Sequence, residues 1–262
     1  MEQSIILDIN AGVAQITLNR PQSLNSFNSE MNIAMLSALK QVSKDSSVRC
    51  LLITGNGRGF CAGQDLGNRK QGKDAKDLDL GKTLDEFYNK AVRIIHNLPI
   101  PVICAVNGVA AGAGANIALA CDLVIAAESA SFIQAFCRLG LIPDAGGTWA
   151  LPRLVGMAKA KALAMLGDKV SATDAERMGM IYAVKPDAEL LAHCQELAHH
   201  LATQPTYGLG LIKRALHQSL DNDLDTQLDV ERDLQRVAGR SEDYRIGVDA
   251  FLNKTKPVYK GR

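Results

Sequence analysis

The fold is decided by the stretch Val102-Ile103-Cys104-Ala105-Val106-Asn107-Gly108-Val109-Ala110-Ala111-Gly112-Ala113-Gly114-Ala115-Asn116, which continues into Ile117–Ala120. An apolar run closed by Asn-Gly predicts a buried strand, and the glycine- and alanine-rich run after it predicts a tight turn into a helix. Leu123–Ala127 and Ser131–Gln134 resemble further short strands. Strands alternating with helices predict an α/β core.

The rest of the first 100 residues fits the same class. The pattern predicts a hairpin, a helix with Ser29 as its cap, a buried strand, a glycine-rich loop, a polar loop and a second helix. The hairpin is expected at Ser4–Asn10 with Val13–Asn19, the first helix at Ser29–Ser43 and the buried strand at Val48–Thr54. The glycine-rich loop is expected at Gly55–Gln64, the polar loop at Gly67–Gly81 and the second helix at Leu84–Leu98.

The pattern becomes wholly helical after about Asp187, with helices expected at Ala188–Gln204, Thr206–Ser219, Leu224–Ala238 and Ser241–Asn253. We therefore expect two regions. Residues 1–190 would form the catalytic core, and residues 191–262 a helical region that packs on the core or on another subunit.

Composition limits the possible partners. A net charge of +1 provides no global field that attracts nucleic acid or a membrane surface. No stretch approaches the roughly 20 apolar residues of a membrane span. The six cysteines show no metal-ligand spacing, and the N-terminus shows no signal peptide, so we expect reduced thiols and a cytoplasmic protein.

Three segments carry candidate chemistry. Gly59–Leu66 follows a strand and contains small residues that let backbone N–H groups approach an oxygen, although an ordinary surface turn would look the same. Asn107–Asn116 exposes backbone donors at a helix start, although tight helix–strand packing explains it equally well. Leu139–Trp149 holds Asp144 in an apolar, glycine-rich turn, where it is either a proton carrier or a helix N-cap.

Two donor loops and one carboxylate together suit proton transfer on an acyl thioester. The donors would hold the carbonyl oxygen as enolate charge develops, at roughly 3 kcal/mol for each good donor. Asp144 would remove a proton at one carbon and return it at another.

Motifs along the whole chain resemble the crotonase (enoyl-CoA hydratase/isomerase) superfamily. They are Leu18-Asn19-Arg20-Pro21, Leu24-Asn25-Ser26-Phe27, Cys61-Ala62-Gly63-Gln64-Asp65-Leu66, Pro101–Gly108, Cys121-Asp122, Gly140–Thr148 and Ala250-Phe251-Leu252.

The resemblance implies a spiral of repeated ββα units with a C-terminal helical region that forms a homotrimer or a dimer of trimers. It implies an acyl-CoA thioester as substrate, with coenzyme A as part of that substrate and no metal or separate cofactor. By motif position, the oxyanion hole would be the backbone N–H groups of Gln64 and Ala113, and the backbone of Ala62 would contact the adenine of CoA.

The resemblance also separates reaction types. Hydratases of the superfamily use two glutamates, whose positions here hold Asn116 and Phe136, so strong hydratase activity is not expected. The acid at Asp144 resembles members with an aspartate at this turn, above all the ring-epoxide isomerases of bacterial phenylacetate degradation. This implies a double-bond shift in a ring-epoxide acyl-CoA, activity on Δ3-enoyl-CoA, and association with other enzymes of that pathway.

Further substrate contacts are expected from a set of residues around the two loops and the Asp144 turn. The set comprises Asp65, Leu66, Gly112, Asn116, Phe136 and Ile142, with Trp149 as a third apolar wall. The alternatives are an aryl-CoA dehalogenase with Asp144 as nucleophile, a general enoyl-CoA hydratase and a non-catalytic acyl-CoA-binding paralogue. A histidine in the pocket would favour the dehalogenase, but the pattern places His96 at the surface.

Overall fold

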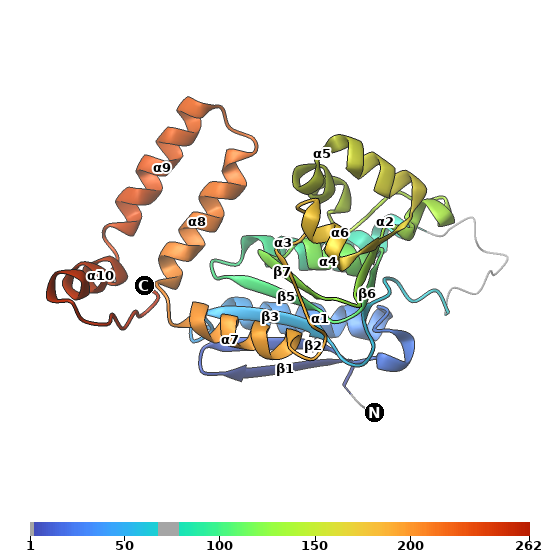
Figure 1. The fold of residues 1–262 in the computed structure, drawn as a ribbon, viewed down its shortest axis with the longest axis horizontal. Helices are drawn as coiled ribbons and strands as arrows, with labels where there is room; N and C mark the ends of the chain where they lie inside the picture. Colours follow the sequence, from blue (N-terminus) through green and yellow to red (C-terminus); the bar gives the residue numbers. More distant parts are fainter. Residues whose placement is uncertain (1–2, 68–78) are drawn as a thin grey trace.

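The structure, a computed structural model, describes residues 3–67 and 79–262. Most of the predicted polar loop Gly67–Gly81 lies outside these residues. The α/β core contains two sheets (Figure 1). The larger has the order β1-β2-β3-β5-β7-β10, formed by Ile5–Asn10, Val13–Leu18, Cys50–Gly55, Val102–Val106, Leu123–Ala127 and Ala183–Lys185. The smaller has the order β4-β6-β8-β9, formed by Gly59–Cys61, Val109–Ala111, Ser131–Ile133 and Lys169–Ser171.

The sheets are mainly parallel, with antiparallel pairs at β1·β2 and β8·β9. Three times, the chain passes from a strand of the larger sheet to one of the smaller sheet and then into a helix. These units are β3-β4-α3, β5-β6-α4 and β7-β8-α5, with short helical segments before α3 and α5. The predicted α/β class is therefore confirmed, with the strand-strand-helix unit as its repeat.

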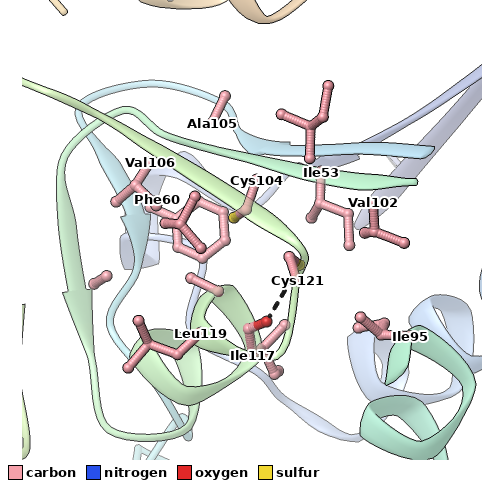
Figure 2. Packing of buried hydrophobic residues seen from close by; sticks show 14 of the residues in the cluster. Ile53, Phe60, Ile95, Val102, Cys104, Ala105, Val106, Ile117, Leu119 and Cys121 are labelled. Carbon is pink, nitrogen blue, oxygen red and sulfur yellow. Dashed lines mark hydrogen bonds between the residues drawn. The ribbon is translucent and has the colours of Figure 1, made fainter. Parts of the chain in front are cut away.

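The central strands are apolar because both of their faces are covered. Every residue of β5 is buried, as is all of β7 except half-buried Leu123. Such continuous apolar runs are typical of parallel strands between helices. Figure 2 shows Phe60 of β4 and Cys104 of β5 packed close to Ile117 of α4. This shared core fixes the start of α4 relative to the loop that follows β4.

The helices are α1 (Ser29–Lys44), α2 (Leu80–Thr83), α3 (Asn89–Asn97), α4 (Ala113–Leu119), α5 (Gly147–Leu166), α6 (Ala172–Arg177), α7 (Leu190–Ala202), α8 (Thr206–Ser219), α9 (Leu224–Ala238) and α10 (Glu242–Asn253). Shorter helical turns are η1 (Pro21–Ser23), η3 (Leu84–Tyr88) and η4 (Ala135–Leu139). The predicted cap of α1 was wrong by one residue, because Asn28 Oδ1, not Ser29, accepts the N–H of Met31 at 2.9 Å.

The C-terminal helices divide into two parts. Helix α7 packs on strands β2, β3, β5 and β7 of the larger sheet and buries Cys194 and Ala198. A division at residue 190 therefore falls at the start of a helix that covers the core. Helices α8 and α9 form a hairpin that projects from the α/β part, and the chain end returns beside the base of α8 (Figure 1). Arg49 anchors this end by donating to the carbonyls of Gln204 and Tyr259.

Within residues 3–67 and 79–262, no helix combines the length and apolar character that crossing a bilayer requires. All six cysteines are free, and five of them are buried, as the sequence predicts.

Candidate active site

The two predicted donor loops meet in the structure. Gly63, with φ of +91°, lies against the β6–α4 turn so closely that an added Cβ would be 2.8 Å from Ala111 O and 3.6 Å from the nitrogen of Ala113. At Gly114, an added Cβ would be 2.4 Å from Cys61 O. Glycine is needed at both positions because the backbones are in direct contact. The loop after β4 and the start of α4 therefore form one unit.

The orientation of the Gln64 amide follows from a parallel bridge to Phe27. Gly63 O accepts from Phe27 N at 2.7 Å, and Asp65 N donates to Phe27 O at 2.9 Å. Because the carbonyl of Gly63 and the N–H of Asp65 point toward Phe27, the N–H of Gln64 points away from Phe27. Ala113 is the first residue of α4, so its N–H has no carbonyl partner within the helix and lies at the positive end of the helix dipole.

The side chain of Gln64 also holds this loop. Its Nε2 donates to Phe27 O at 2.9 Å, and its Oε1 accepts from the hydroxyl of Tyr88 at 2.7 Å. Tyr88 in turn packs edge-on against Phe27, with ring centroids 5.8 Å apart. The Tyr88 and Phe27 contacts were not predicted from the sequence, since neither position carries a local signal for its distant partner.

The next two loop residues have different environments. The carboxylate of Asp65 forms an ion pair with Arg20 at 2.9 Å and accepts the N–H of Gly67, and these contacts lower the pKa of Asp65, the Gly67 bond most. Asp65 thus has a structural role in holding the loop, which the sequence did not reveal. Leu66 is exposed, and the N–H of Ala62 donates to Leu24 O at 2.9 Å.

Gly112 and Phe136 lie together. An added Cβ on Gly112 would be 3.6 Å from Cζ of Phe136, so the ring covers the turn that leads into Ala113. Phe136 is buried, and its carbonyl accepts the N–H of Leu141 at 3.0 Å. Phe136 therefore contacts the donor turn through its ring, and the segment that leads to Asp144 through its backbone carbonyl.

Asp144 lies in the turn before α5 and is half-buried, with its Oδ1 atom shielded from solvent. The N-cap residue of α5 is Gly146, without a side-chain cap, so the interpretation of Asp144 as an N-cap is wrong. Its carbonyl oxygen, not its carboxylate, receives the N–H of Gly147 at 2.8 Å. The carboxylate of Asp144 therefore does not cap α5.

Asn116 joins this turn to α4. Its Nδ2 donates to the carbonyl oxygen of Asp144 at 2.8 Å, and its Oδ1 accepts from Nε2 of Gln134 at 2.8 Å. Asn116 and Ala113 are one helical turn apart, which brings the Asp144 turn to the same helix as the second predicted donor. Gln134 is a further residue of the site region that the sequence analysis missed.

The three predicted apolar walls have different environments in the single chain. Ile142 is 78% exposed, because the turn before α5 directs it outward. Trp149 is the third residue of α5 and lines a cavity of about 630 Å³ between α3, α4, α5 and α8. Only Phe136 lies on the donor turn.

His96 also lines this cavity, so its predicted surface position was wrong. It is half-buried and stacks on His217 of α8, with ring centroids 3.8 Å apart, and it meets the Trp149 ring edge-on at 5.3 Å. Burial lowers the pKa of both histidines, that of His217 to about 4. The cavity reaches Asn116, Ala145 and Gly146, so it lies behind the Asp144 turn.

In the described ranges, no cluster of three or more His, Cys, Asp or Glu side chains has the geometry to hold a metal ion. The contacts join the loop of Gln64 to the start of α4, the Phe136 ring to Gly112, and the Asp144 turn to α4 through Asn116. The candidate groups are two backbone amides, an apolar ring and one carboxylate. This combination suits the stabilisation of an oxyanion next to a proton transfer.

Known proteins match this chain over nearly its whole length. Residues 8–262 match the family model of enoyl-CoA hydratase/isomerase. The chain is 56% identical to the 1,2-epoxyphenylacetyl-CoA isomerase of Escherichia coli, with all of both chains covered. It is 46% identical to a probable enoyl-CoA hydratase of Rhodobacter capsulatus, over 99% of this chain and 98% of that protein.

The structure supports the same relationship. A crystal structure described as a putative enoyl-CoA hydratase/isomerase from Mycobacterium abscessus superposes with a TM-score of 0.94 at 33% identity, covering 98% of this chain and 100% of that one. The repeated strand-strand-helix units are thus the fold that the sequence motifs implied. This chain belongs to the enoyl-CoA hydratase/isomerase, or crotonase, family.

Proposed function

We propose that this protein is an acyl-CoA isomerase in which Asp144 moves a proton between two carbons of the substrate. The thioester carbonyl would lie between the N–H groups of Gln64 and Ala113. The observation that carries the proposal is the close contact of Gly63 with the Ala111–Ala113 turn, on a helix that also holds the Asp144 turn through Asn116.

The step conserves atoms and charge. With a Δ3-enoyl-CoA, the Asp144 carboxylate takes a proton from C2, and the electrons of that C–H bond form the C1=C2 bond of a dienolate as the carbonyl π electrons move to the thioester oxygen. When the carbonyl re-forms, the C1=C2 electrons form the C2=C3 bond and the C3=C4 electrons bind a proton at C4. The protonated Asp144 then returns the proton to C4, which completes the shift of the double bond from C3=C4 to C2=C3. Positioned proton transfer contributes typically 10²–10⁴-fold to such a rate.

We propose a ring substrate, 1,2-epoxyphenylacetyl-CoA converted to its oxepin, as the main reaction. The support is the 56% identity to the E. coli isomerase of that name. Phe136, which packs on Gly112, offers an apolar surface beside the proposed donor Ala113. The remaining proposed contacts to the acyl-CoA are the backbone of Ala62 and the Asp65-Leu66 segment, with Ile142 available only at the rim.

The test compares two substrates. The purified protein is incubated with 1,2-epoxyphenylacetyl-CoA and with a cis-3-enoyl-CoA, and the products are separated by chromatography and mass. We expect products of unchanged mass from both, with faster conversion of the ring substrate. Failure to convert either substrate would contradict the isomerase assignment, and a preference for the straight chain would contradict only the ring substrate.

The dehalogenase alternative has one supporting observation, because His96 lines the cavity behind the Asp144 turn. In that reaction Asp144 would attack the ring carbon and displace halide. However, His96 packs against His217 and Trp149, and this packing makes it part of the α3–α5–α8 contact. Halide release from 4-chlorobenzoyl-CoA, measured with an ion-selective electrode, distinguishes the alternatives, and we expect none.

We also propose that residues 191–262 assemble the chain into a homotrimer or a dimer of trimers in the cytoplasm, where it would meet other enzymes of phenylacetate degradation. Phe251 and Leu252 of α10 are 83% and 71% exposed in the single chain, and Leu224 of α9 is 73% exposed. Light scattering coupled to size-exclusion chromatography would give the mass of the assembly. A monomer would contradict this proposal.

A further inference from the structure

Asn116 is the most completely buried polar residue near Asp144, at 1% exposed. Both ends of its amide are used, since Nδ2 donates to Asp144 O and Oδ1 accepts from Gln134 Nε2, each at 2.8 Å. Gln134 is itself only 5% exposed. The two amides form a chain of hydrogen bonds from the end of β8, through α4, to the turn that carries Asp144.

This turn needs such a support. Ala145 has a φ of +47° and Gly146 a φ of +82°, so the backbone just after Asp144 is left-handed at a residue that has a Cβ. Such a conformation costs free energy and persists only when its surroundings hold it in place. The carbonyl of Asp144 accepts two hydrogen bonds, from Asn116 Nδ2 and from Gly147 N, and these fix the peptide plane at the start of the turn.

The turn after Asp144 also packs tightly against Asn116. An added Cβ on Gly147 would be 2.3 Å from Asn116 Nδ2, so the turn rests directly on the amide. An aspartate at position 116 would retain the acceptor for Gln134 but would present an oxygen to the carbonyl of Asp144. Two acceptors at hydrogen-bond distance repel one another, so the turn would move away from α4.

Resting on the proposed function, we infer that Asn116 is a positioning residue that sets Asp144 relative to the oxyanion donor Ala113, and that Gln134 orients Asn116. Ala113 and Asn116 are on the same face of one helix, one turn apart. The side-chain amide of Asn116 therefore fixes the distance between the N–H of Ala113 and the turn that carries Asp144. A shift of about 1 Å in such an arrangement can cost about 10²-fold in rate.

The test uses Asn116→Asp and Gln134→Met, with Thr54→Val as the matched control. Thr54 is buried in β3, and its hydroxyl donates to Ala105 O at 2.9 Å, so this variant also loses one buried hydrogen bond, but within the main sheet. For each variant, kcat and KM for the preferred substrate are measured, together with the thermal midpoint and the Kd of a non-isomerisable saturated acyl-CoA.

We expect kcat to fall about 10²-fold in Asn116→Asp and about 10-fold in Gln134→Met, with KM and Kd changed less than about threefold. Thr54→Val should keep the wild-type kcat. The thermal midpoint excludes a merely structural role for Asn116. Loss of folded protein would lower kcat in parallel with the midpoint, whereas a positioning role lowers kcat in protein that is fully folded at the assay temperature. Should Asn116→Asp not fold, Gln134→Met decides the question by the same criteria.

A kcat within threefold of wild type in folded Asn116→Asp would overturn the inference, as would a KM or Kd that rises as much as kcat falls. Asp144→Asn, measured alongside, separates this outcome from failure of the proposed function. If Asp144→Asn retains normal turnover, the proposed function fails. If it is inactive while Asn116→Asp is normal, only the positioning role fails.

Discussion

The two halves of the candidate site are built differently. The donor half, formed by the loop after β4 and the start of α4, is held by direct backbone packing at Gly63 and Gly114. The acid half, formed by residues 139–148, is mostly exposed and is held by the side chain of Asn116 and the backbone carbonyl of Phe136. The half proposed to stabilise charge is therefore part of the core, whereas the half proposed to move protons is attached to it.

This difference explains how one fold can support several reactions. Changing an acid in the attached half needs only a side chain and its hydrogen bonds. Changing the donor half requires the two loops to separate, which disrupts the core that Figure 2 shows. The relatives of this chain include proteins named as isomerases and as hydratases, which is the pattern expected from such a construction.

A first large effect is expected in the reaction type. Because Asn116 is committed to Asp144 and Gln134, and Phe136 is apolar, the acid half offers Asp144 alone for proton transfer among the residues discussed. Water addition needs both a base and an acid, and one positioned group is worth about 10²–10⁴-fold. We expect hydration of crotonyl-CoA, followed by loss of absorbance of the enoyl thioester, to be at least about 10²-fold slower than isomerisation. Equal rates would show that a second carboxylate enters the site.

The next prediction concerns the tight packing of the donor half. It compares the free energy of unfolding after a glycine-to-alanine substitution in the donor half and in α8. Gly114→Ala places a Cβ 2.4 Å from Cys61 O, and we expect a loss of about 2–3 kcal/mol in the free energy of unfolding. Gly208→Ala in α8 meets no atom within 4 Å and should be neutral or stabilising by up to about 1 kcal/mol. Urea denaturation measures both. Similar stabilities for the two variants would mean that the donor loops are not in tight contact.

The smallest effect concerns what lies behind the acid half. Burial holds the pKa values of His96 and His217 below that of a histidine in the unfolded chain, and Lys213 opposes protonation of both. The histidines of the unfolded chain therefore take up protons first as pH falls below about 6.5. The free energy of unfolding consequently decreases between that pH and about 4. Asp122, which pairs with Lys213 at 2.9 Å, partly offsets this by raising the pKa of His96.

His217→Gln should weaken this dependence. Because both rings keep solvent contact, screening reduces the effect to about 1 kcal/mol, or about 2–4 °C in thermal midpoint. We expect the midpoint of wild type to fall by that much more than that of His217→Gln between pH 7 and pH 5, measured by scanning calorimetry. Parallel curves would mean that the stacked pair does not remain neutral.

The sequence predicted those parts of the molecule that depend on local patterns. Helices α8 and α9 have the predicted bounds, Thr206–Ser219 and Leu224–Ala238, because apolar spacing and caps are local. Strands β4, β6, β9 and β10 were missed, since most three-residue strands carry little local pattern and depend on their distant partners; of these short strands, only β8 was predicted. The Asn116–Gln134 contact and the His96–His217 stack join segments far apart in the chain, and no spacing within either segment encodes them.

The most direct measurement is the turnover of Asp144→Asn on a cis-3-enoyl-CoA, with the affinity for a saturated acyl-CoA measured by calorimetry on the same protein. The substitution keeps the size of the side chain and the backbone hydrogen bonds of the turn but removes the base. We expect a kcat at least about 10³-fold below wild type with a Kd within about threefold. Near-normal turnover with unchanged binding would contradict it, because the proton would then be carried by another group.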